Sequence, residues 1–225
     1  MQKDEQPVEP CSGSASRAPA RRFHHGNLRQ ELIDAALSAP DIEGLSLRQL
    51  AGSRGVTPAA VYRHFDSREA LLFEVARCGF ERLRQRFAAA FDRAVPPSNA
   101  DEACQRLIDL ARAYLQFAED EPALWRLMFG AQAESYRSTA DVHGDPGSYA
   151  YLPAALNGLY QRGVIPAEPH EHDALFAWSA IHGAASLRSG RVPAALMPMA
   201  ALAHTVAGRV IRAMQHPPLG DETAT

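Results

Sequence analysis

The sequence has little that would suit it to a membrane, an oxidising compartment or a metal site. No apolar run approaches the roughly 20 residues that a bilayer-spanning helix needs. Residues 1–22 carry acidic side chains early and have no apolar centre, so we expect no secretory signal there. Cys11, Cys78 and Cys104 are scattered without paired spacing, which favours reduced thiols in a cytoplasm over disulfides or a zinc site.

The residue groupings of an enzyme are also missing. We find no nucleophile–base arrangement and no phosphate-binding loop, so we expect no catalysis and no cofactor. One cluster, His170-Glu-His-Asp173, has metal-ligating side chains. Residues two apart on a helix point in different directions, and no second cluster completes a ligand set. A solvated, acidic helix start is therefore the better interpretation, and we expect no bound metal.

The formal net charge of −3 argues against a nucleic-acid partner, but its distribution does not. Residues 17–93 hold 13 arginines against 9 acidic residues, whereas residues 94–225 hold 9 arginines against 14 acidic residues. An arginine-rich first half joined to an acidic second half suggests that one part faces phosphate and the other has a different task.

Helical periodicity dominates the chain, which shows almost no strand-type alternation and no internal repeat. We predict an all-α protein with an N-terminal group of short helices and a C-terminal helical bundle. Its expected parts are a disordered extension (1–20), a domain of short helices (21–85), a helical domain (86–216) and a flexible tail (217–225). In the second half, helices are expected at about 100–118, 121–130, 131–139, 149–162, 171–189 and 195–214, with a loop at 141–148.

The strongest motif lies between residues 47 and 65. Ala51 is small where two helices must approach closely, and Gly55 tolerates the positive φ of a tight turn. Six residues further on, Val61 can fix the second helix to the first. Both helices have start signals, Ser46 with Gln49 and Thr57 followed by Pro58. An ordinary corner between two helices could use the same residues, but the exposed side chains favour DNA binding.

Those exposed side chains fall into two groups. The start of the second motif helix should enter the major groove, where alanine methyl groups can pack on thymine methyl groups. The remaining polar residues suit the sugar–phosphate backbone, although each arginine could equally be a solvated surface charge. The predicted DNA-contacting residues are Ser46, Arg48, Thr57, Pro58, Ala59, Ala60, Tyr62, Arg63, His64 and Arg68. His24 and His25 could touch DNA or belong to a flexible arm.

Three stretches, at 23–37, 45–51 and 56–72, resemble the TetR/AcrR family of transcriptional regulators. The resemblance covers about residues 23–87 and is most specific from Val56 to Leu72. In the second half, Leu175–Gly183 resembles the Trp-His-Gly signature of one C-terminal subclass of that family, and Pro122–Phe129 is also similar to it.

This resemblance implies a homodimeric repressor with a helix-turn-helix DNA-binding domain (21–85). It also implies that the C-terminal bundle (86–216) is an effector-binding and dimerisation domain that takes a small molecule. A dimer is also physically reasonable, because one short recognition helix reads only a few base pairs. By analogy with the family, helices at about 149–162 and 171–189 are the interface candidates. The candidate effector-pocket residues, which could equally be ordinary core, are Tyr114, Phe117, Trp125, Met128, Phe129, Trp178 and His182.

His182 lies on an apolar stripe and is more simply a hydrogen-bonded core histidine than a ligand contact. Two function classes other than a ligand-responsive repressor also remain open. One is a small helical enzyme that uses His182 with a carboxylate. The other is a dimeric adaptor that has kept the fold but lost DNA binding, and a basic recognition helix argues against it.

Overall fold

The computed structural model describes residues 28–130, 147–190 and 198–216, and every regular element in these ranges is a helix. This confirms the all-α prediction. The predicted N-terminal extension, the helix at 131–139, most of the loop at 141–148 and the tail lie outside the described residues. The helices are α1 (Leu28–Leu37), α2 (Leu47–Arg54), α3 (Pro58–Tyr62), α4 (Arg68–Ala90), α5 (Ala100–Asp120), α6 (Pro122–Phe129), α9 (Tyr151–Gln161), α10 (Glu171–Gly190) and α11 (Met199–Gln215).

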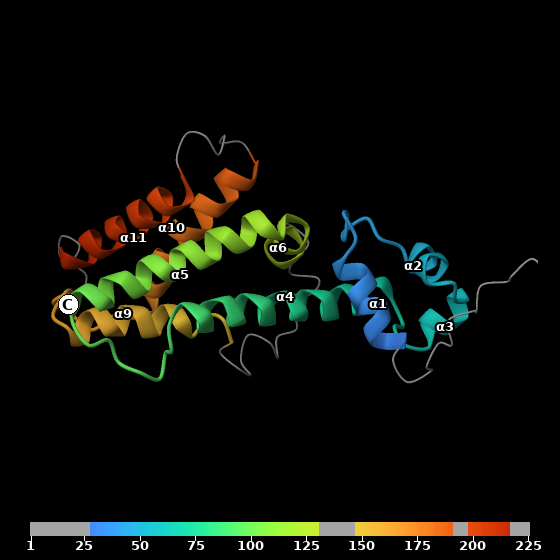
Figure 1. Cartoon of the computed structure of the whole chain (residues 1–225), viewed down its shortest axis with the longest axis horizontal. Coiled ribbons are helices and arrows are strands. Elements are labelled where there is room, and N and C mark those ends of the chain that lie inside the picture. Colours follow the sequence, from blue (N-terminus) through green and yellow to red (C-terminus); the bar gives the residue numbers. More distant parts are fainter. Residues whose placement is uncertain (1–27, 131–146, 191–197, 217–225) are drawn as a thin grey trace, which may run out of the picture.

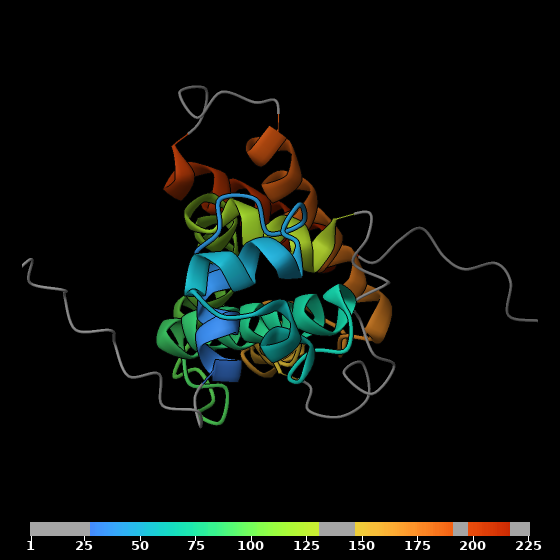
Figure 2. The same ribbon diagram turned by 90° about the vertical axis from the view of Figure 1, so that its right-hand side faces the viewer.

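Helix α4 connects two groups of helices. Figure 1 shows α1, α2 and α3 gathered at one end of α4, while the other end enters a bundle of α5, α6, α9, α10 and α11. Figure 2 views the molecule from the α3 end, with the short helices in front of the bundle. Helix α5 is the centre of the bundle, because it packs against α4, α6, α9, α10 and α11.

Side-chain caps set the starts of the two longest helices, α4 and α5. The Ser67 hydroxyl accepts a hydrogen bond from the Ala70 N–H at 3.0 Å, which opens α4. The Asn99 side chain does the same for α5, accepting from the Glu102 N–H at 2.8 Å. These bonds satisfy N–H groups that a helix start leaves free.

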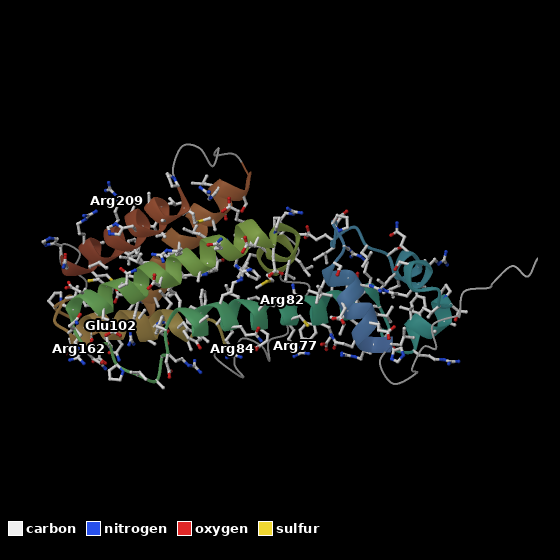
Figure 3. The ribbon with its side chains drawn as sticks, viewed as in Figure 1. Arg77, Arg82, Arg84, Glu102, Arg162 and Arg209 are labelled. Carbon is white, nitrogen blue, oxygen red and sulfur yellow. The ribbon has the colours of Figure 1, made fainter. Side chains whose placement is uncertain are left out.

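The bundle is held by an apolar core and by ion pairs at its surface. Leu107, Leu115 and Phe117 of α5 are fully buried. Where α4 passes the end of α5, Arg82 pairs with Glu121 at 2.5 Å; Figure 3 shows Arg82 on the length of α4 that faces the bundle. Because such partly exposed pairs contribute little stability, apolar burial holds α4 to α5.

Two further sequence predictions concern cysteine and metal. Cys78 and Cys104 are free thiols, and burial raises the pKa of each. At the start of α10 the Asp173 carboxylate accepts a hydrogen bond from the His170 N–H at 2.8 Å, as expected of an acidic helix start. Within the described ranges no group of three or more metal-ligating side chains occurs, and no helix is long and apolar enough to span a membrane.

Candidate functional site

The turn between α2 and α3 has the geometry that the motif predicts. Ser46 and Gln49 form a capping box at the start of α2. Gly55 ends the helix in the left-handed region at φ 65°, and the Val56 N–H donates to the Ala51 carbonyl at 3.1 Å. A side chain at position 55 would strain this backbone, which is why glycine is needed there.

Helix α3 is oriented by what it buries. Val61 is fully buried and Phe65 nearly so, and both belong to the core shared with Ala51 of α2. The Thr57 hydroxyl accepts from the Ala60 N–H at 3.3 Å, and Pro58 occupies the first helical position. These contacts fix one face of a five-residue helix against α2 and leave the opposite face outward.

The outward face carries the residues that we predict to contact DNA. Tyr62 is 48% exposed. Arg63 and His64, which follow it, are exposed as well. Among the predicted DNA-contacting residues, Ser46 and Ala60 are half-buried. Seven others are exposed, namely Arg48, Thr57, Pro58, Ala59, Tyr62, Arg63 and His64.

Arg68 differs from this group, because its guanidinium is occupied within the protein. Its Nε donates to the Leu45 carbonyl at 2.9 Å and its Nη2 donates to the Glu43 carbonyl. The side chain thus ties the start of α4 to the loop between α1 and α2. The phosphate contact that the sequence predicts for Arg68 stays a prediction. The structure adds an internal positioning role, which local sequence pattern does not reveal because both carbonyls lie more than 20 residues away.

Replacing Arg68 with Ala is expected to lower the free energy of unfolding by about 1–3 kcal/mol, because two carbonyl partners lose a charged donor. Urea denaturation followed by circular dichroism measures this change. Arg48→Ala is the matched control: Arg48 is exposed on α2, so its loss should alter stability by less than about 0.5 kcal/mol. An Arg68→Ala protein as stable as wild type would contradict this positioning role.

A second feature is an apolar cavity of about 110 Å³ inside the C-terminal bundle. Helix α4 contributes the wall facing α5, α6 and α10, and the turn before α9 closes one side. Three predicted pocket residues, Tyr114, Phe129 and Trp178, line it. The remaining described lining residues, which the sequence analysis missed, are Phe80, Leu83, Phe87, Leu110, Ser148, Tyr149, Leu152 and Ile181.

The other predicted pocket residues are not among those that line the cavity. Phe117 and Met128 are buried in the core. Trp125 stacks on the His182 imidazole, with ring centroids 5.2 Å apart, and both rings pack against the lining residue Phe129.

His182 is hydrogen-bonded, as the core interpretation expects. Its Nδ1 lies 2.7 Å from the Tyr114 hydroxyl, and the two atoms share a hydrogen bond. The rings of Trp125, Phe129 and Trp178 surround the imidazole at centroid distances of 4.9–5.3 Å. Burial raises the pKa of Tyr114 well above its ordinary value, an effect that the indole groups of both tryptophans oppose. Tyr114 is therefore a neutral phenol.

Both halves of the chain match described protein families. Residues 32–75 match "Bacterial regulatory proteins, tetR family", and residues 107–208 match "Tetracyclin repressor-like, C-terminal domain". The Trp-His-Gly subclass within that family stays a prediction.

Curated relatives match over part of their length. The chain is 33% identical over 113 residues to the HTH-type transcriptional regulator Rv1816 of Mycobacterium tuberculosis, covering 50% of this chain and 44% of the relative. It is 32% identical over 109 residues to the HTH-type transcriptional regulator BetI of Rhizobium meliloti, covering 47% and 52%. The chain thus spans about half the length of these relatives.

Solved structures match over nearly the whole chain. A protein of unknown function from Rhodococcus sp. RHA1 has a TM-score of 0.70 and 30% identity, covering 88% of this chain and all of that one. The TetR family transcriptional regulator PfmR from Thermus thermophilus has a TM-score of 0.59 at 20% identity, covering 80% and 96%, and supports the fold. With family matches in both halves and this shared fold, the chain belongs to the TetR family of bacterial transcriptional regulators.

Proposed function

We propose that this protein is a homodimeric, ligand-responsive repressor that binds a palindromic operator through α3. The observation that carries the proposal is the division of α3 into a buried side at Val61 and an exposed side at Tyr62. A helix anchored in this way can lie in the major groove while its polar flanks meet phosphate.

The surface of α10 supports the dimer. Leu175, Phe176 and Leu187 are each at least half exposed, which is costly for large apolar side chains in water. The residues between them on the exposed side are small, so a partner helix could approach closely. Helix α9, the other predicted interface helix, exposes Tyr160. Helix α11 packs against α10 within the same chain. We therefore place α10 at the centre of the interface.

Helix α4 is suited to couple ligand binding to DNA binding. Its C-terminal half contributes Phe80, Leu83 and Phe87 to the cavity, and its first residue, Arg68, holds the loop between α1 and α2. A ligand that moves this half of α4 would shift α3 with it. The spacing of the two recognition helices in the dimer would then no longer match the operator.

A gel-shift titration tests the proposal. Fragments selected from a random duplex library should contain a palindrome, and the full palindrome should bind at least about 100-fold more tightly than one half-site. Affinity should fall steeply with salt, because phosphate contacts release counterions.

A surface variant links this binding to α3. Arg63→Ala should weaken binding to the palindrome by about tenfold, as expected for the loss of one charged contact to DNA. Arg112→Ala, which removes an exposed arginine of α5, is the matched control and should leave affinity unchanged. Equal binding to palindrome and scrambled duplex would contradict the proposal.

A further inference from the structure

We infer that the cavity of the C-terminal bundle binds a neutral, planar molecule with a single ring. This inference rests on the proposed ligand response and adds to it the chemical class of the effector.

The volume of the cavity limits the ligand to one ring. At about 110 Å³ it is somewhat smaller than an engineered apolar cavity of roughly 150 Å³ that accepts benzene. Tyr149, at its edge, is half exposed, so a short substituent can extend toward solvent there. A fused polycyclic compound or a long acyl chain would not fit.

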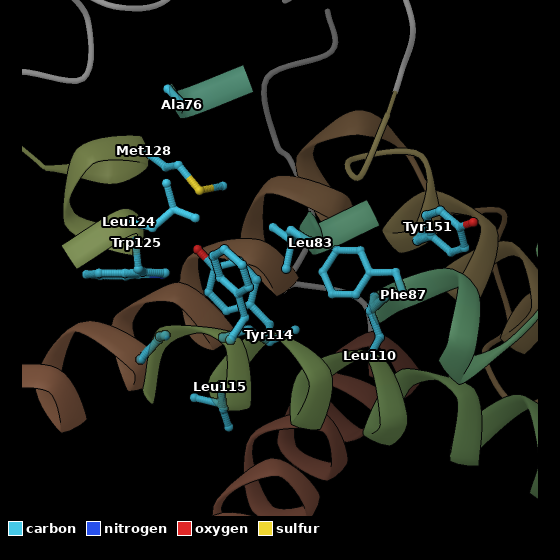
Figure 4. Packing of buried hydrophobic residues seen from close by; sticks show 14 of the residues in the cluster. Ala76, Leu83, Phe87, Leu110, Tyr114, Leu115, Leu124, Trp125, Met128 and Tyr151 are labelled. Atoms are coloured by element: carbon cyan, nitrogen blue, oxygen red, sulfur yellow. The ribbon is translucent and has the colours of Figure 1, made fainter. Parts of the chain in front are cut away.

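The shape of one wall favours a flat ligand. The rings of Phe87 and Tyr114 both line the cavity, with planes only 21° apart and centroids separated by 6.5 Å. Figure 4 shows the two rings side by side, next to Leu83. Together they form a nearly continuous aromatic surface on which a planar ring can stack with an offset.

The lining offers no counter-charge to a charged ligand. Of the described residues that line the cavity, none is Lys, Arg, Asp or Glu. Tyr114 is a neutral phenol, as argued above. Transferring a carboxylate or an ammonium group into such a site without a partner costs several kcal/mol. The ligand is therefore neutral.

Isothermal titration calorimetry on the full chain tests each part with three probes of similar size. Acetophenone is neutral and planar. Benzoate adds a charge, and cyclohexyl methyl ketone removes the planarity. Acetophenone should bind at least about tenfold more tightly than benzoate and the cyclohexyl ketone.

Leu152→Trp, which fills the cavity, should weaken acetophenone binding by more than about tenfold. Val95→Trp adds the same group at an exposed position and should leave binding unchanged. Benzoate or the cyclohexyl ketone binding as tightly as acetophenone would overturn the inferred ligand class. The absence of acetophenone binding to a wild-type protein that still binds its palindrome would overturn it as well. Acetophenone binding without any effect on operator affinity would instead support the ligand class and contradict ligand-responsive repression.

Discussion

Val61→Asp is expected to unfold the helix-turn-helix and to abolish binding to the operator. Val61 is fully buried between α3 and α2, and the described core around it contains no buried polar or charged residue that could pair with a carboxylate. An unpaired charge in such a site costs about 4 kcal/mol or more, which exceeds the usual range of point substitutions. Urea denaturation followed by circular dichroism should show the loss of part of the helical signal at low denaturant.

Ala59→Asp separates folding from DNA contact. It introduces the same charge two residues earlier on the exposed side of α3, so it should leave the unfolding transition unchanged. It should nevertheless weaken DNA binding, because the carboxylate faces phosphate. If Val61→Asp were as stable as wild type, the burial of α3 described here would be wrong.

Gly79→Val is expected to destabilise the protein by about 1–3 kcal/mol through overpacking. Gly79 is buried where α4 crosses α6. A Cβ atom there would overlap the Met128 sulfur and lie 3.0 Å from Cδ1 of Leu124. Because Met128 and Leu124 are themselves buried, the two helices must separate to admit the larger side chain.

Gly52→Val is the control for this substitution. Gly52 is exposed in α2, and a Cβ there meets nothing within 4 Å. Its replacement should change the free energy of unfolding by less than about 0.5 kcal/mol. The pair is compared by urea denaturation. Equal stability of the two variants would mean that α4 and α6 are not in close contact at Gly79.

The helix-turn-helix could be predicted because its signals are local. The cap at Ser46, the left-handed turn at Gly55 and the Thr57–Pro58 start each depend on residues within four positions. The boundaries of α2, Leu47–Arg54, therefore agree with the start signal at Ser46 and the turn predicted at Gly55. Spacing alone also separated Val61, which is buried, from Tyr62, which is not.

The cavity could be predicted only in part, because it depends on contacts between distant helices. Helical spacing shows that Leu83 and Phe87 belong to a buried face, but not that this face meets α10 across a cavity. Phe117 and Met128 are large apolar side chains at helical spacing, as most lining residues are, and yet they pack in the core. The internal role of Arg68 escaped prediction for the same reason.

Dimethyl sulfate protection on a selected palindrome tests most directly whether the exposed side of α3 reads the major groove. The reagent modifies guanine N7, which lies in that groove. We expect two symmetry-related protected segments, separated by about 34–36 Å or a multiple of it, and loss of protection with Arg63→Ala. Tight binding of the wild-type protein with all major-groove guanines still reactive would contradict the account.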